Sequence, residues 1–169
     1  VTYREAIVGK FPEQIVIGIA KDANGKCNPI SLGWTMNTSH NPPMMAISVA
    51  LTHYSREVLD AAEGFVIAMP SEHQAEETLY FGSHSGRTCD KFADMNTKLQ
   101  PAVEIDCMLM SDAVANFECR KFGQLETGDH MIYVGQVVRS HIHPDLPRRL
   151  YTLNHTAEGF TFGGLSRAE

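Results

Sequence analysis

The sequence predicts a mainly β protein of the α+β class, built as a barrel with a few short helices. Short segments rich in β-branched and aromatic residues recur along the chain, with turn-forming residues between them. Strand-like and helix-like segments do not alternate regularly, as they do in parallel α/β sheets. The chain also lacks the GxGxxG motif of a dinucleotide-binding Rossmann domain.

Four segments in the first half have the composition expected of strands, apolar and rich in β-branched residues. They are residues 14–21, 27–34, 44–51 and 65–69. Asn24-Gly25 lies between the first two and suits a tight hairpin turn, which needs positive φ. Pro42-Pro43 interrupts regular structure ahead of the third strand.

Two helices are expected in the same half. Residues 54–63 carry apolar side chains at helical spacing, with Ser55 as a possible N-cap. Residues 72–81 begin with acidic side chains, which suit the positive end of a helix dipole. The second half is mostly sheet: long strands at 113–125 and 130–141 joined by a turn at 126–129, a short helical turn at 146–150, and a last short strand at 160–162.

Size and charge narrow the classes of function. The 169 residues fit one domain over residues 1–169. A net charge of −6 argues against nucleic-acid binding, which needs clustered Lys and Arg. With no run of about 18 apolar residues and no signal-peptide pattern, we expect a soluble, cytoplasmic protein that does not bind membranes. The four cysteines form no CxxC pair, so we expect free thiols.

Four segments, taken in order, match one pattern. They are residues 28–39 running into Asn41-Pro42-Pro43, then Ser55-Arg56-Glu57, Asp90-Lys91-Phe92 and Gly128-Asp129-His130. In this order and at these separations they resemble the flavin reductase-like family, and Gly-Trp-Thr-Met-Asn at 33–37 is similar to its flavoredoxin branch. The resemblance covers roughly residues 11–165 and implies an FMN-binding split β-barrel.

FMN has a flat apolar ring with polar edges, a ribityl chain and a dianionic phosphate. A site for it needs an aromatic wall, hydrogen-bond donors and a cation or free N–H groups. Residues 31–41 offer such groups in a polar connection between two apolar strands. The resemblance implies that Trp34, Thr35, Met36 and Asn37 lie along the ring and the ribityl chain. A surface loop, with Trp34 in the core or in a dimer contact, is the alternative.

At the phosphate end, Ser55-Arg56 open the expected helix, whose first N–H groups suit an anion. The resemblance implies that Ser55 and Arg56 contact the phosphate or the ribityl chain, although Ser55 also suits a simple N-cap. Lys91 is expected as a point charge near the phosphate or the N1/O2 edge of the ring, and a solvated surface lysine is the alternative. Asp90 is expected to orient Lys91 or to cap a helix.

Other candidates come from the loop before Lys91 and from the C-terminal half. His130 follows a tight turn and is the candidate catalytic residue, since its imidazole suits donation to the flavin or proton relay; capping the turn is the alternative. Phe162 is expected in an aromatic wall, as is Phe160, although we expect one of the two to pack in the core. The weaker candidates for the phosphate are Ser83, Ser85 and Arg87.

We expect no metal site, because the pair His141 and His143 has no evident third ligand.

Three functions stay open at this stage. A flavin reductase takes hydride from NADH or NADPH, whereas a flavoredoxin exchanges electrons with protein redox partners. The absence of a GxGxxG motif and the Gly-Trp-Thr-Met-Asn sequence at 33–37 favour the electron carrier slightly. A non-redox protein of the same fold that stores FMN or binds pyridoxal phosphate is the third. The resemblance also implies a homodimer with FMN near the subunit interface, and the acidic balance suits basic redox partners.

Overall fold

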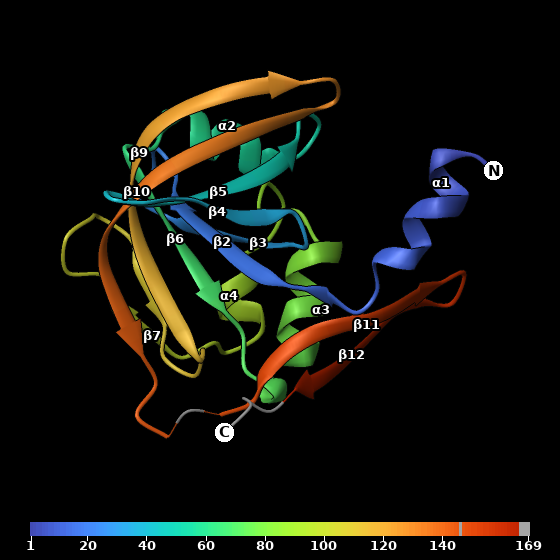
Figure 1. The fold of residues 1–169 in the computed structure, drawn as a ribbon. Coiled ribbons are helices and arrows are strands. Elements are labelled where there is room, and N and C mark those ends of the chain that lie inside the picture. Colours follow the sequence, from blue (N-terminus) through green and yellow to red (C-terminus); the bar gives the residue numbers. More distant parts are fainter. Residues whose placement is uncertain (146, 166–169) are drawn as a thin grey trace.

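A seven-stranded antiparallel sheet organises the computed structural model, which describes residues 1–145 and 147–165 (Figure 1). Its spatial order is β3-β2-β6-β9-β10-β5-β4. The strands are β2 (Val16–Lys21), β3 (Cys27–Leu32), β4 (Thr35–His40), β5 (Pro43–Ala50), β6 (Gly64–Met69), β9 (Ala115–Thr127) and β10 (His130–Ile142). Only Gly33 and Trp34 join the edge strands β3 and β4, so the sheet has to curl until its edges approach, as in a split barrel.

Short helices and two small sheets make up the rest of the fold, and α1 projects away from the large sheet (Figure 1). The helices are α1 (Tyr3–Ala6), the 3-10 turn η1 (Ile7–Lys10), α2 (Tyr54–Ala61), the 3-10 turn η2 (Glu72–Gln74), α3 (Ala75–Ser83) and α4 (Lys91–Asp94). A second sheet contains β1 (Glu13–Gln14), β11 (Arg149–Thr156) and β12 (Gly159–Leu165), and β7 (Leu99–Pro101) pairs with β8 (Met108–Met110). The β11–β12 hairpin lies beside α3 in Figure 1. Within the described residues, no helix is long and apolar enough to cross a membrane.

The central strands β2 and β6 are buried on both faces. Val16 and Ile67 belong to the core cluster that α2 also fills, whereas Ile17 and Val66 belong to a second cluster with Phe81 of α3. Successive side chains of a strand point to opposite faces, so neighbouring residues enter different cores. This double burial explains why both segments are continuously apolar rather than alternating.

Most of the expected elements are confirmed. The expected strands at 14–21, 27–34, 44–51, 65–69, 113–125, 130–141 and 160–162 correspond to β1 with β2, β3, β5, β6, β9, β10 and β12. The expected helices at 54–63 and 72–81 correspond to α2 and to η2 followed by α3. In the β2–β3 turn Gly25 has φ +84°, but Asn24 has no positive φ, because the Asp22 carboxylate closes the turn by accepting two backbone N–H groups.

Three local expectations are wrong. Most of the polar segment 31–41 is not a connection but the edge strand β4, which pairs with β5. Ser55 is not the N-cap of α2; His53 occupies that position, and Ser55 lies in the first turn. Residues 149–150 begin β11 rather than a helical turn, since Arg149 pairs with Leu165 across β12, while residue 146 lies outside the described residues.

Candidate functional site

Two cavities adjoin the C-terminal end of α3, and both are lined by Gly82 and Ser83. The first, here the polar cavity, measures about 230 Å³ and is lined by residues 52–55 at the start of α2, residues 81–86 and Lys91. The second, here the aromatic cavity, measures about 350 Å³ and is lined by side chains that include Trp34, Phe160 and Phe162. Together they place a hydrophilic compartment directly beside an aromatic one.

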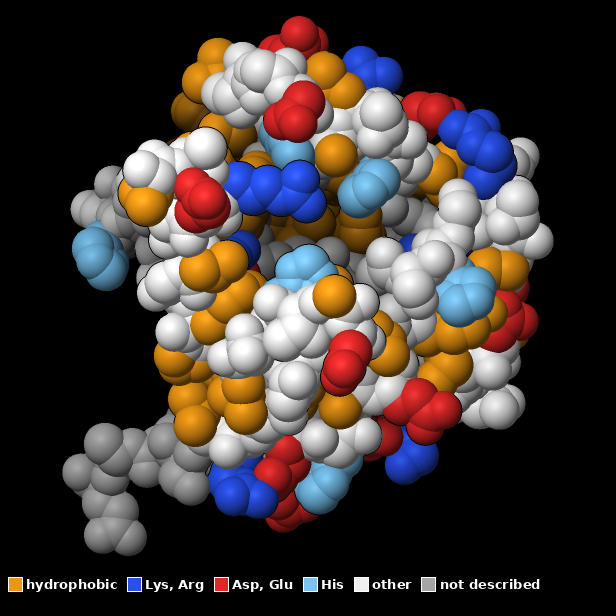
Figure 2. Space-filling model, turned by 90° about the vertical axis from the view of Figure 1, so that its right-hand side faces the viewer, with side chains coloured by type: hydrophobic (Ala, Val, Ile, Leu, Met, Phe, Trp, Pro, Cys, Tyr) orange, Lys and Arg blue, Asp and Glu red, His pale blue; other side chains and the backbone are white. Residues whose placement is uncertain are grey.

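The two cavities lie toward the side of the molecule where the β9–β10 and β11–β12 hairpins end in Figure 1. Figure 2 looks onto that side and shows it hollowed near its centre. Apolar side chains lie within the hollow, and histidines surround it. This side of the molecule therefore has a hollow with apolar side chains in it.

Lys91 is the buried cation of the polar cavity. Asp90 caps α4 by accepting the Ala93 N–H at 3.2 Å, and the Lys91 side chain, only 3% exposed, donates from Nζ to the carbonyl of Phe81 at 2.9 Å. In the described part of the chain no carboxylate forms an ion pair with it. Burial lowers the pKa of Lys91 to about 8. A buried ammonium without a counter-ion is costly, and a bound anion would relieve that cost.

The start of α2 forms another wall of the polar cavity. His53 makes no side-chain cap, so the N–H groups of Tyr54 and Ser55 stay available to a ligand, while the Arg56 N–H donates to the carbonyl of His53. Ser55 is buried, and its Oγ accepts a hydrogen bond from Asn28 Nδ2 at 2.8 Å. Burial lowers the pKa of His53, and the charges of His130 and Lys91 lower it further. The donors around this cavity all favour an anion.

The aromatic cavity combines flat rings with one unused hydroxyl. The ring of Trp34 lies against that of His130, with centroids 4.5 Å apart and planes at 36°. Phe160 and Phe162 stack with centroids 6.3 Å apart on the β11–β12 hairpin. Thr78 Oγ1 is buried with no hydrogen-bond partner among the described residues. A flat ligand with a polar edge suits this lining.

The structure brings most of the candidates from the sequence together. Ser55 and Lys91 line the polar cavity, while Trp34 and Phe162 line the aromatic one. His130 packs on Trp34, and its Nδ1 lies 2.6 Å from Asp129 Oδ1. Of the weaker candidates, Ser83 lines both cavities and Ser85 the polar one.

Six candidates line neither cavity, and one of them is His130, which adjoins the aromatic cavity only through its contact with Trp34. On β4, Thr35 donates from Oγ1 to the carbonyl of Ala46, and Met36 and Asn37 are exposed. The guanidinium of Arg56 pairs with Asp60. Arg87 pairs with Glu57 and lies over the ring of Tyr54. Alternation along the strand puts Thr35 and Asn37 on the face opposite to Trp34, whereas Met36 shares the face of Trp34 but is 55% exposed and does not line the cavity.

Sequence reasoning also missed three residues. They are Asn28, which holds Ser55; His53, the N-cap of α2; and Thr78, the unpartnered hydroxyl. Asn28 opens the first of the four matching segments, which was the one available signal. His53 and Thr78 have no local signal, because the packing of α2 and α3 brings them to the cavities.

Comparison with known proteins identifies the family of the chain. A family model described as a flavin reductase like domain matches residues 8–161. The stachydrine N-demethylase reductase subunit Stc3 of Rhizobium meliloti is 31% identical over 138 residues, 79% of this chain and 55% of its own, so the chain spans about half of that relative.

Two solved structures show the same fold. The FMN-binding protein of Thermus thermophilus has a TM-score of 0.82 at 19% identity, over 96% of this chain and 92% of its own. Flavoredoxin from Methanosarcina acetivorans has a TM-score of 0.78 at 21% identity, over 93% and 87%. The expected split barrel and the resemblance are thereby confirmed. Since the family model covers most of its length, the chain belongs to the flavin reductase-like domain family.

Proposed function

We propose that the protein binds FMN across the two cavities and transfers electrons through it, as one flavin reductase-like domain over residues 1–169. The observation that carries the proposal is Lys91, a buried cation without a carboxylate partner in the described residues, in a cavity beside aromatic rings. Family membership supports the same assignment, and the relatives include both a reductase subunit and a flavoredoxin.

The two cavities fit the parts of FMN. Lys91, the first N–H groups of α2 and Ser55 would hold the phosphate, and the shared wall at Gly82 and Ser83 would accommodate the ribityl chain. Trp34 and Phe162 would contact the ring, with the hydroxyl of Thr78 available to its polar edge. Thr35, Met36, Asn37 and Arg56 have no such place in either cavity.

His130 is proposed to hold the proton that accompanies electron transfer. When bound, the flavin supplies a centre that accepts and releases two electrons. The Asp129 carboxylate, 2.6 Å from Nδ1, favours the tautomer with its proton on Nδ1, which leaves Nε2 to accept or donate a proton. Trp34 covers one side of the imidazole and limits its contact with water.

A homodimer is also proposed. The strand β4 is an edge of the seven-stranded sheet, and it exposes Met36 beside the half-exposed Trp34. On the β9–β10 hairpin, Phe122 and Leu125 are 69% and 62% exposed. Apolar side chains beside an unpaired strand edge suit a second copy, with FMN close to the interface. Sedimentation at micromolar concentration should give twice the chain mass of 18.7 kDa, and a monomer would contradict the proposal.

Anaerobic absorbance spectroscopy tests the proposed function. The protein, incubated with FMN and freed of excess, should show a flavin spectrum. Bleaching within seconds of adding NADH or NADPH identifies a reductase, whereas a spectrum that persists until dithionite is added identifies an electron carrier served by protein partners. Failure to retain flavin would refute the proposal, and retention of pyridoxal phosphate instead would establish the non-redox alternative.

A further inference from the structure

Two cysteines far apart in the sequence meet beside the β2–β3 hairpin. Cys27 is the first residue of β3, and its Sγ lies 4.0 Å from the Sγ of Cys107, which directly precedes β8. Both are free thiols. A disulfide bond measures about 2.0 Å, so the two sulfurs need to approach by roughly 2 Å. The thiols of the other cysteines, Cys89 and Cys119, contact the backbone carbonyls of Ser85 and Phe117.

The two thiols differ in their access to solvent. Both thiols are buried, Cys27 9% and Cys107 5% exposed, but Cys27 lines a surface cavity of about 710 Å³, together with Lys21 and Lys26, whereas Cys107 does not. The hydrogen bond between them lowers the pKa of Cys27 against the effect of burial, and the Lys21 ammonium adds to the lowering. The same contact, with burial, raises the pKa of Cys107. Cys27, at the wall of the cavity, is therefore the first nucleophile, and Cys107 is the second thiol.

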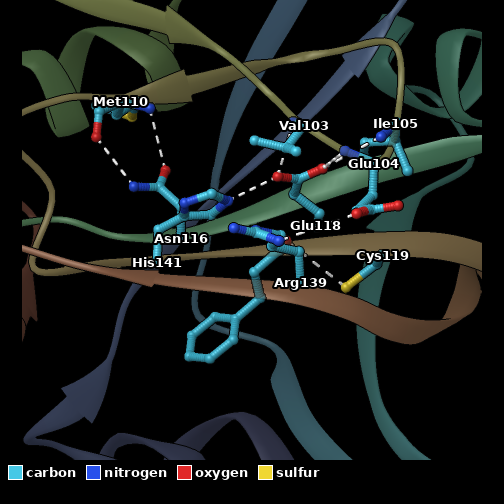
Figure 3. Close-up of polar contacts among 10 residues, drawn as sticks. Val103, Glu104, Ile105, Met110, Asn116, Glu118, Cys119, Arg139 and His141 are labelled. Atoms are coloured by element: carbon cyan, nitrogen blue, oxygen red, sulfur yellow. Dashed lines mark hydrogen bonds and ion pairs between the residues drawn. The ribbon is translucent and has the colours of Figure 1, made fainter.

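The segment that carries Cys107 is held firmly in place. The Glu118 carboxylate accepts backbone N–H groups of residues 103–105, as Figure 3 shows. Asp106 is paired with Lys21, and the Cys107 thiol contacts the carbonyl of Ile19. Because this backbone is fixed, the approach of the two sulfurs has to come from rotation of the two side chains.

We propose that Cys27 and Cys107 are a redox-active dithiol that a low-molecular-weight disulfide oxidises to an intramolecular disulfide. The Cys27 thiolate attacks one sulfur of the oxidant, forms a mixed disulfide and releases the first thiolate. Cys107 loses its proton and attacks Cys27 Sγ, which releases the second thiolate. The two cysteine protons end on the two released thiols, and two electrons pass from the cysteines to the oxidant.

The new bond would join residues 80 positions apart, the start of β3 and the segment before β8. Cross-linking distant positions restricts the unfolded chain more than the folded one. The oxidised protein is therefore expected to melt at least about 5 °C above the reduced protein. The proposal depends on the thiols alone and is independent of flavin binding.

The test uses the full chain with Cys89→Ser as background, so that Cys27, Cys107 and Cys119 are the remaining thiols. The reduced protein is treated with excess oxidised glutathione, then denatured, alkylated and examined by mass spectrometry. We expect one alkylated thiol, a loss of two hydrogens, and a peptide that links Cys27 to Cys107. Two further variants on this background report the order of attack: Cys107→Ser should retain glutathione on Cys27, and Cys27→Ser should leave Cys107 unmodified.

Persistent glutathione on Cys27 while Cys107 is present would overturn the proposal, and so would three alkylated thiols after treatment. The linked peptide shows whether Cys27 and Cys107 form a disulfide in the Cys89→Ser protein, even where a further variant folds poorly. Loss of flavin binding in the same samples would bear on the proposed function and not on the dithiol.

Discussion

Replacement of Lys91 by methionine is expected to weaken FMN binding by about 10- to 100-fold without destabilising the apoprotein. A charge-assisted hydrogen bond contributes about 1.5–3 kcal/mol, and each 1.4 kcal/mol is about tenfold in affinity. Methionine fills a similar volume and removes a buried charge that no carboxylate of the described residues pairs with. Flavin titration measures the affinity, and urea unfolding of the apoprotein measures the stability.

The pH dependence of the stability of the apoprotein gives an independent measure of the lowered pKa of Lys91. Burial lowers its pKa to about 8, whereas an unfolded lysine titrates near about 10.4. Between these values the unfolded chain binds more protons, so the stability of the wild type rises as pH rises from about 8 to about 10.4, by roughly 3 kcal/mol. Lys91→Met is expected to lack this rise.

Lys98→Met is the matched control, since Lys98 is largely exposed and pairs with Asp112. We expect its FMN affinity to stay within about twofold of the wild type, because exposed ion pairs contribute little. Equal losses in the two variants would mean that FMN responds to general charge rather than to a contact at Lys91. Unchanged affinity in Lys91→Met would place the phosphate elsewhere.

Replacement of Glu118 by glutamine is expected to lower stability by about 3 kcal/mol, or roughly 6–12 °C in Tm. Glu118 is fully buried, and both oxygens are occupied (Figure 3). Oε1 accepts from Val103 N at 2.9 Å and from His141 Nε2 at 2.6 Å, and Oε2 from Glu104 N at 2.6 Å and Ile105 N at 3.1 Å. A glutamine places an NH₂ group opposite at least one of these backbone N–H groups, and a backbone N–H cannot accept a hydrogen bond from it.

The same carboxylate predicts a loss of stability in acid. Burial favours the neutral form of Glu118, but the donated hydrogen bonds outweigh burial and lower its pKa. Its stabilising contribution is therefore complete above the unfolded pKa of about 4.3 and is lost as pH falls through the lower folded pKa. Thermal melts from pH 7 to pH 3 should show the gap between wild type and Glu118→Gln narrowing with acid.

Glu126→Gln on the same strand serves as the control, because Glu126 is exposed. We expect its Tm to match the wild type within about 2 °C. If Glu118→Gln melts at the wild-type temperature, the carboxylate does not hold residues 103–105, and the fixed backbone assumed for Cys107 loses its support.

The fold class and the family follow from the sequence alone, for a local reason. Apolar, β-branched segments that end in Gly, Pro and Asn turns specify antiparallel strands whatever lies beside them, and most strands were placed correctly. Four short motifs in order were enough to indicate the family. Ser55, Lys91 and Trp34 were also named from the sequence, because they stand within those motifs.

Only the tertiary structure shows which way each side chain points and which strands pair. The edge strand β4 is polar because solvent contacts it, so its composition resembles a loop, and only its pairing with β5 shows that it is a strand. The cavity beside Trp34 is formed by α3 and the β11–β12 hairpin, which are distant from it in sequence. His53, Thr78 and the sulfur pair are brought into place by elements distant in sequence. A sequence motif indicates which residues are candidates for the site. Where their side chains point depends on how the whole chain packs.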